Sequence, residues 1–286
     1  MFDDIQVVVD SVSSILDTDM KNDPRIDILR LVTRHGDLEW RDGDKSEEEL
    51  FAMIEKYGDL PKTSQLAIGE MIELLTKITD TGKKVIMIMC DSTLSGTYAT
   101  ACMAAREVNK TLKRDDVRVV DCKTCSCPIL GVVNCVLDAI ENGTTLDEVE
   151  KLANDCVDRT ETYFSVDTLD YLHKGGRIGK IGVLFGNIFG SRPIIHTDEN
   201  GVLEIADKCR TRKKTIKRIL ELACACAPIE EIFVAHSACQ AEADYLQQYM
   251  MEQFPGVPCM QTKIGSVLAA HLGPGAIGVF VRKRKA

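Results

Sequence analysis

Hydroxyl side chains gather in two short segments of the sequence that are suited to holding an anion. Asp91–Thr97 follows an apolar, strand-like run and leads into a helix-like stretch, and Pro61–Gln65 stands just before another expected helix. Free backbone N–H groups point outward at a helix N-terminus, where the helix dipole also favours negative charge. Serine and threonine serve equally well there as helix caps. Each segment alone therefore predicts either an anion site or a cap.

A histidine near the C-terminus is the third candidate. His271 ends an apparent helix and precedes a Gly-Pro-Gly turn, where its side chain could face a cleft, although a lone histidine can also be structural. Ser95 as nucleophile with His271 as base would make an acyl hydrolase. Ser95 is not part of a G-x-S-x-G segment, so this interpretation is the less favoured one.

The cysteines argue against a metal centre. The chain has 12 of them, and the only dense group is Cys122, Cys125 and Cys127. Zinc normally needs a fourth ligand at a fitting spacing, and no second Cys or His pair follows nearby. We therefore expect small residues on a loop that enters a helix, and no metal. Cysteines scattered through strands and helices are typical of a reducing compartment, which predicts a cytoplasmic protein.

Two glycine-rich stretches resemble nucleotide-binding loops without meeting their requirements. Gly273–Gly278 fits G-x-G-x-x-G, but only eight residues follow it, too few for the helix, strand and acid of a dinucleotide fold. Gly175–Lys180 is too short for a phosphate loop, and Ile181 replaces the required hydroxyl residue. We expect no nucleotide cofactor.

The elements that would position these residues follow two patterns. In the first 160 residues, apolar strand-like runs end in Asp and alternate with helix-like stretches, which predicts an α/β, doubly wound parallel-sheet domain with ligands at the carboxyl ends of its strands. The expected strands are Ile5–Val9, Val85–Cys90 and Val117–Val120, with helices after a Ser46–Glu49 capping box, over about 67–80 and over about 97–110.

From about residue 161 the pattern becomes that of an α+β domain with a mixed sheet. Asn200-Gly201 between two expected strands predicts a hairpin. We assign residues 1–160 and 161–286 to two domains with a ligand cleft between them. The strands expected here are Tyr163–Val166, Pro193–His196, Val202–Lys208, Ile232–Ala235, Val257–Gln261 and Ile277–Val281, and the helices Thr211–Ala225 and Ala238–Gln253.

Charge excludes some partners and suggests others. The formal net charge is −9, which is poorly suited to a nucleic-acid backbone. No apolar run reaches the roughly 20 residues of a membrane span, and the first residues lack a secretory signal pattern, so we expect no stable membrane insertion. Residues 172–218 carry eleven Lys or Arg and four acids, a net +7. Solvated helix surface accounts for several of these lysines, but such a face can also steer an anionic ligand or partner.

Six segments in colinear order resemble the DegV family of bacterial lipid-binding proteins. Together they extend over nearly the whole chain, and the set is more specific than any one segment. They are Val9–Ser11, Leu60–Gln65, Leu94–Tyr98, Leu169–Ile178, Arg210–Lys214 and His271–Gly275.

The resemblance implies a two-domain α/β protein that binds a long-chain fatty acid between its domains and needs no cofactor or metal. Some members are the acyl-carrying subunits of a bacterial fatty acid kinase, which would phosphorylate the carboxylate. By resemblance, Thr63, Ser95 with its neighbour Gly96, and His271 would bind the carboxylate. Arg177 and Arg210 would lie at the partner-docking surface.

Under this interpretation the protein is not itself an enzyme, and ATP chemistry belongs to the kinase catalytic subunit. A lipid transport or sensor protein without a kinase partner is an open alternative. The apolar residues of 183–189, with Ile194 and Ile195, would line the tail or belong to the core.

Overall fold

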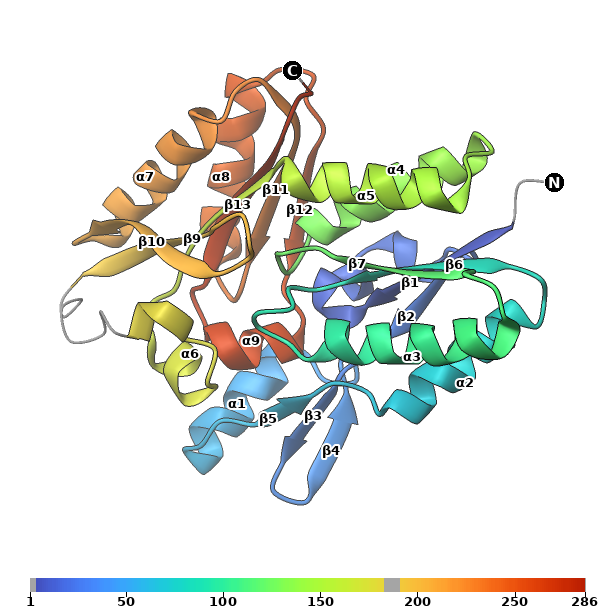
Figure 1. The fold of residues 1–286 in the computed structure, drawn as a ribbon. Helices are drawn as coiled ribbons and strands as arrows, with labels where there is room; N and C mark the ends of the chain where they lie inside the picture. The colour runs from blue at the N-terminus through green and yellow to red at the C-terminus, as the bar shows by residue number, and fades with distance from the viewer. Residues whose placement is uncertain (1–3, 183–190, 286) are drawn as a thin grey trace.

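The computed structural model describes residues 4–182 and 191–285, and its first half is built on a four-stranded parallel sheet (Figure 1). The strand order is β2-β1-β6-β7. The two central strands are apolar and almost completely buried because helices cover both faces of the sheet. The strands are β1 (Ile5–Asp10), β2 (Ile26–Leu29), β6 (Lys84–Met89) and β7 (Val117–Asp121).

Two pairs of helices sandwich this sheet. Figure 1 shows α2 (Ile68–Thr79) and α3 (Thr97–Leu112) below it, and α4 (Pro128–Glu141) with α5 (Leu146–Asp158) above it. The predicted doubly wound architecture is therefore confirmed.

The stretch after β1 differs from the expected helix. It forms three short 3₁₀ turns, η1 (Ser11–Ser13), η2 (Ile15–Asp17) and η3 (Asp19–Asn22). Ser14 between the first two turns has a left-handed backbone with φ of 63°, which interrupts a regular helix.

The second half contains a six-stranded mixed sheet in the order β10-β9-β8-β13-β11-β12. Helices α7 (Arg212–Cys224) and α8 (Gln240–Gln253) cover one of its faces. The predicted mixed sheet is confirmed, although β12 begins two residues later than expected. The strands are β8 (Thr160–Ser165), β9 (Arg192–Thr197), β10 (Leu203–Cys209), β11 (Ile229–His236), β12 (Cys259–Lys263) and β13 (Ile277–Lys283).

The β9–β10 connection is the predicted hairpin. Strands β9 and β10 pair antiparallel, and Gly201 in the turn has a φ of 81°, which favours glycine.

The two faces of the six-stranded sheet pack against different partners. Along β11, Ile232 and Val234 pack in the core under α7 and α8, whereas Phe233 and Ala235 belong to the core of the parallel sheet. This alternation follows from the two-residue period of a strand. The sheet therefore presents one face to its own helices and the other to the first half of the chain.

A third, three-stranded sheet was not expected. It has the order β4-β3-β5, with β3 (Val32–His35), β4 (Leu38–Arg41) and β5 (Lys62–Ser64). Helix α1 (Glu47–Tyr57) lies between β4 and β5 in the chain, and its Ser46–Glu49 capping box is present as predicted. Pro61–Gln65 was placed just before a helix, and its strand β5 was not foreseen. The centre of this segment pairs with β3, with Thr63 opposite Thr33, and α2 begins at Ile68.

Acidic side chains of the first 50 residues hold the loops of the second half. Each accepts a hydrogen bond from a backbone N–H group, so the N-terminal segment fixes the loops around the short helix α9 (Ser266–Leu272). The pairs are Asp17 with Lys263 (2.7 Å), Asp42 with Val267 (3.3 Å) and Glu47 with Ala238 (3.1 Å).

Across 4–182 and 191–285, no helix has both the length and the apolar character needed to span a bilayer.

Candidate functional site

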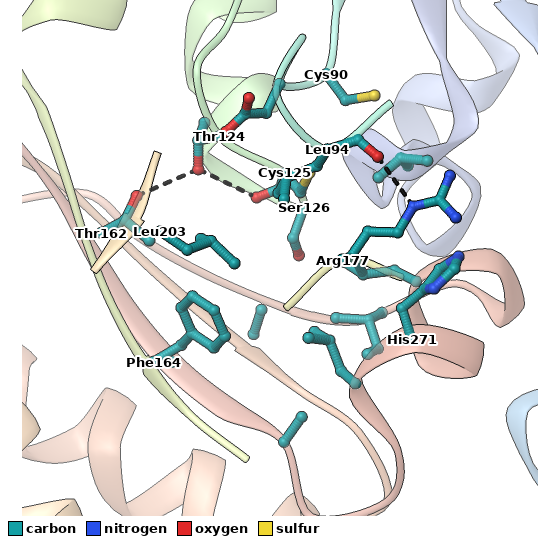
Figure 2. Close-up of a pocket in the computed structure, with 18 of the residues that line it drawn as sticks. Cys90, Leu94, Thr124, Cys125, Ser126, Thr162, Phe164, Arg177, Leu203 and His271 are labelled. Carbon is teal, nitrogen blue, oxygen red and sulfur yellow. Dashed lines mark hydrogen bonds between the residues drawn. The ribbon is translucent and has the colours of Figure 1, made fainter. Parts of the chain in front are cut away.

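A deep, largely apolar pocket lies between the parallel sheet and the inner face of the six-stranded sheet. The space between its walls is about 950 Å³ when its open mouth is included. Figure 2 shows side chains from the six-stranded sheet, such as Phe164 and Leu203, and from the loops after the parallel strands, such as Leu94 and Thr124, around it. Its apolar wall includes Val12, Leu94, Phe164, Leu172, Leu203, Ile264, Val267, Leu268, Leu272, Ile277 and Phe280.

The loops at the carboxyl ends of three parallel strands form one side of this pocket. Val12 follows β1, Asp91 to Ser95 follow β6, and Thr124 to Ser126 follow β7. This is the edge where the strand pattern places ligands in open α/β sheets.

At one end of the pocket, Thr63 and His271 share a hydrogen bond of 2.7 Å between Oγ1 and Nε2. Thr63 comes from β5 and His271 from α9, so two segments 208 residues apart in the chain meet here. Burial, followed by the nearby charge of Arg177, lowers the pKa of His271 to about 4. His271 is therefore a neutral imidazole at pH 7, and together with the Thr63 hydroxyl it can donate a hydrogen bond to an anion.

The absence of a side chain at Gly175 leaves room for the ring of His271. A Cβ atom at Gly175 would collide with Nδ1 of His271 and would lie 2.9 Å from the carbonyl oxygen of Tyr171. Gly175 follows α6 (Asp170–Lys174), which lies beside α9. Gly175, the first residue of the stretch that resembles a phosphate loop in the sequence, thus has a steric role in the structure.

Ser95 also lines the pocket, but Gly96 does not. The Ser95 hydroxyl shares a hydrogen bond of 2.9 Å with the Thr97 hydroxyl and accepts one from the Thr97 N–H at the start of α3. Gly96 is exposed, lies against the side chain of Gln65, and is absent from the described wall of the pocket. Ser95 and Thr63 therefore reach the cavity, whereas Gly96 supports the loop.

The geometry does not assemble a hydrolase triad. Within the described chain, Ser95 bonds Thr97 rather than His271, and Nδ1 of His271 has no hydrogen-bond partner, acidic or otherwise. A serine nucleophile requires a base within hydrogen-bond reach and a group that orients the base.

The two candidate docking arginines lie in different places. Arg177 borders the pocket and donates hydrogen bonds to the carbonyl oxygens of Leu94 (3.0 Å) and Gly175 (2.8 Å). Arg210 is exposed in the turn between β10 and α7. Sequence reasoning placed both at a surface, and the position of Arg177 beside the pocket was not foreseen.

The cysteine cluster lies on the loop before α4. Cys122 and Cys127 are buried, and burial raises the pKa of both thiols, that of Cys127 to about 12. Cys125 faces the pocket next to Cys90. At neutral pH Cys122 and Cys127 are protonated thiols that act as small apolar groups.

Residues 183–189, which were predicted to line the tail or belong to the core, lie outside the described residues. Ile194 and Ile195 are core residues, the first under α7 and α8 and the second beside α6. Most of the apolar wall comes from side chains far apart in sequence, and no local pattern marks them.

The fold and the site together define an α/β protein with an apolar pocket between a parallel and a mixed sheet. Comparison with known proteins gives its family. The sequence profile described as "Uncharacterised protein, DegV family" matches residues 4–284. A DegV domain-containing protein of Streptococcus pyogenes serotype M1 is 30% identical over 284 residues, which cover 98% of this chain and 99% of the relative. The chain belongs to the DegV family.

Solved structures agree with this assignment. DegV from Bacillus subtilis, described as a fatty acid binding protein, has a TM-score of 0.84 and 27% identity, and the match covers 98% of this chain and 99% of that one. A fatty acid binding DegV family protein from Streptococcus agalactiae has a TM-score of 0.88 at 23% identity, covering 98% and 99% of the two chains. The match to the Streptococcus agalactiae protein supports the fold.

Proposed function

We propose that this protein binds a long-chain fatty acid in the pocket between its two sheets and presents the carboxylate to a separate kinase. The observation that carries the proposal is an apolar cavity with the hydrogen-bonded pair of Thr63 and His271 at one end and Ser95 in its wall. In this arrangement the tail lies against apolar side chains, and hydroxyl and imidazole groups hold the head.

The energetics fit such a ligand. Burying about 15 methylenes at roughly 0.8 kcal/mol each gives a gross stabilisation on the order of 12 kcal/mol. Loss of translational freedom and ordering of the chain offset a substantial part of it. A hydrogen bond to the charged head adds roughly 1.5–3 kcal/mol. The tail therefore supplies most of the affinity, and the polar end fixes the orientation.

The relatives support the same ligand class. The Bacillus subtilis DegV is described as a fatty acid binding protein, and a DegV family protein from Thermus thermophilus, 26% identical with a TM-score of 0.83, is described by its fatty acid binding.

The kinase step is the finer part of the proposal. Neither glycine-rich stretch meets the requirements of a phosphate loop, so ATP would be bound by a partner polypeptide in the cytoplasm. Arg210 is exposed on the basic segment and suits docking. Arg177 borders the pocket, and we place it where the docking surface meets the carboxylate site. The protein itself then carries out no chemistry.

The direct test begins with mass spectrometry of the organic extract of the purified protein, which should contain a long-chain fatty acid. Delipidated protein is then titrated with hexadecanoic acid and with its methyl ester. Wild-type protein should prefer the acid because the ester has no charged head. An empty extract together with no binding of either compound would end the proposal.

Three variants locate the carboxylate. Thr63→Val, Ser95→Ala and His271→Ala should each weaken binding of the acid roughly tenfold to a hundredfold and leave binding of the ester almost unchanged. Ser92→Ala, at an exposed serine of the same loop, is the matched control and should behave as wild type. If wild type and all four variants bind the acid and the ester equally, Thr63, Ser95 and His271 have only structural roles. Ester hydrolysis that disappears in Ser95→Ala would favour the hydrolase.

A further inference from the structure

Two neighbouring thiols lie in the wall of the pocket. Cys90 directly follows β6, and Cys125 lies on the loop after β7. Both residues line the cavity, and Figure 2 shows them on the same side of it. Their thiols are hydrogen-bonded to each other, and neither cysteine is part of a disulfide. Binding of a fatty acid gives no role to either thiol.

The backbone holds this pair at a spacing that suits a disulfide. The N–H of Asp91 donates to the carbonyl oxygen of Thr124 (3.0 Å), so the peptide group after Cys90 is bonded to the peptide group before Cys125. A disulfide needs Cα atoms within about 7 Å of each other, and a hydrogen bond between the adjoining peptide groups suits this requirement. Closing the bond therefore depends mainly on rotation of the two side chains.

The two thiols differ in accessibility. Cys90 is 1% exposed, whereas Cys125 is only half-buried. The hydrogen bond with Cys125, followed by burial and the charge of Asp10, raises the pKa of Cys90 above its ordinary value. Cys122, another thiol nearby, is buried and is not part of the described wall of the pocket. A molecule that enters the pocket therefore meets Cys125 first, with Cys90 as a protonated thiol beside it.

Two neighbouring thiols can together reduce a hydroperoxide, ROOH. The sulfur of Cys125 attacks the terminal oxygen, the O–O bond breaks, ROH leaves, and Cys125 becomes a sulfenic acid. The sulfur of Cys90 then attacks the sulfur of Cys125, the S–O bond breaks, and the leaving hydroxide takes the proton of Cys90 to form water. Two thiols and ROOH thus give one disulfide, ROH and water, with two electrons passing from sulfur to the peroxide.

Resting on the proposed fatty acid site, we infer that Cys90 and Cys125 form a redox site that an alkyl hydroperoxide oxidises to a disulfide while the pocket is empty. The alkyl group of such an oxidant suits the apolar wall. A bound fatty acid covers this wall and keeps the oxidant out, so lipid-loaded protein retains both thiols. The pair therefore responds to peroxide only in lipid-free protein.

Mapping the first disulfide that forms tests the site on delipidated full-length protein. The protein is treated with limiting tert-butyl hydroperoxide, the remaining thiols are alkylated, and the chain is digested with trypsin. Cleavage after Lys84, Arg106, Lys123 and Lys151 places Cys90, Cys122 and Cys125 on three different peptides. We expect peptide 85–106 to be linked to peptide 124–151, and dithiothreitol to separate them. No link, or a link from the peptide of Cys122 in its place, overturns the inference.

Single variants assign the two roles. Cys90→Ser should leave Cys125 as a sulfenic acid that dimedone traps, and Cys125→Ser should leave Cys90 as a thiol, so neither variant forms the link. Cys102→Ser is the matched control, because Cys102 on α3 shares a tryptic peptide with Cys90. This variant should form the disulfide as wild type does. Loss of the link in Cys102→Ser would contradict the assignment to Cys90.

A second experiment measures protection by the ligand. Hexadecanoic acid is saturated and does not consume the peroxide. At about ten times its Kd only about a tenth of the pockets are empty, so the disulfide should form about tenfold more slowly. Butanoic acid at the same concentration is the control, because its chain is too short to cover the wall, and it should leave the rate unchanged.

The outcomes separate this inference from the proposed function. If hexadecanoic acid binds but the disulfide forms at an unchanged rate, the inference is overturned and the fatty acid site stands. If hexadecanoic acid does not bind, the proposed function fails and protection fails with it. A disulfide mapped to Cys90 and Cys125 would then still support the redox site.

Discussion

Asp91 shows how the burial of a single carboxyl group can lower stability at neutral pH. Burial is the largest cause that raises the pKa of Asp91 to about 6, and the charges of Asp121 and Asp198 act in the same direction. Its ordinary value is 3.8. The folded protein therefore holds a proton on this carboxyl group over a pH range in which the unfolded chain has released it.

The sign of the pH dependence follows from this difference. Because the folded state binds the proton more tightly, the free energy of unfolding falls as pH rises from about 4 to about 6 and stays lower above that. Asp91→Asn keeps the Oδ1 acceptor for the Thr93 N–H and removes the charge. We expect this variant to be more stable than wild type at pH 8 by on the order of 1–3 kcal/mol, with the gain fading toward pH 4.

Urea unfolding at pH 8 and pH 4.5 measures this gain. His271 titrates in both proteins, so its own contribution, which lowers stability as pH falls from 6.5 toward 4, cancels in the difference. A gain of the same size at both pH values would show that the charge of Asp91 is not responsible.

At the scale of elements, helix α9 depends on a residue far away in the sequence. Gly265 at its N-cap has no side chain to accept a hydrogen bond, and Asp42 takes that role from the segment after β4. Its Oδ1 accepts from the Ser266 hydroxyl (2.9 Å) and the Val267 N–H (3.3 Å). Asp42 therefore acts on the site indirectly, by positioning the helix that carries His271.

We expect Asp42→Ala to lower stability by roughly 1–3 kcal/mol and to narrow the preference for hexadecanoic acid over its methyl ester. Asp42→Asn retains Oδ1 and should restore most of both properties. Denaturant unfolding and the paired titrations measure the two effects. A loss of stability with an unchanged preference for the acid would show that Asp42 supports the fold without positioning His271.

The elements differ in how far the sequence could predict them. The long apolar strands β1, β6 and β13 and the helices α2, α3, α7 and α8 were located within a few residues. Helix α5 was not given bounds, although one of its faces is buried. Strands β2 to β5 have only three or four residues with irregular burial, too short for a period to appear. Their pairing depends on tertiary contacts, which a single sequence does not display.

The site was predictable only in part for the same reason. Thr63, Ser95 and His271 stand beside local signals or family motifs, and all three reach the pocket. The approach of Arg177 to the cavity was not visible, because it depends on how α6 packs against α9.

Over the whole molecule, most arginines of the basic segment are already paired with acids. Arg192 pairs with Asp167, Arg212 with Glu242, and Arg218 with Asp207. Arg210 makes no ion pair with any residue of 4–182 or 191–285 and is exposed. Its charge is thus available to a partner, while the chain as a whole carries −9.

We expect Arg210→Glu to leave hexadecanoic acid affinity within twofold of wild type. With a bacterial fatty acid kinase catalytic subunit and ATP, it should reduce acyl-phosphate formation several-fold, more strongly at low salt, where long-range attraction is least screened. Lys110→Glu, the same charge change on exposed α3, is the control. Undiminished turnover would remove the docking role, and a protein that supports no turnover in its wild-type form would favour the transport or sensor function.

The place of β13 has a consequence for how the pocket wall assembles. This strand lies inside the six-stranded sheet, hydrogen-bonded to β8 on one side and β11 on the other, although β8 stands far before it in the sequence. Until β13 pairs, β8 and β11 have no partner between them, and the wall formed by Ile277 and Phe280 is missing. The pocket is therefore completed by a pairing between distant segments, and such pairings form slowly because loop closure costs entropy before the contacts are made.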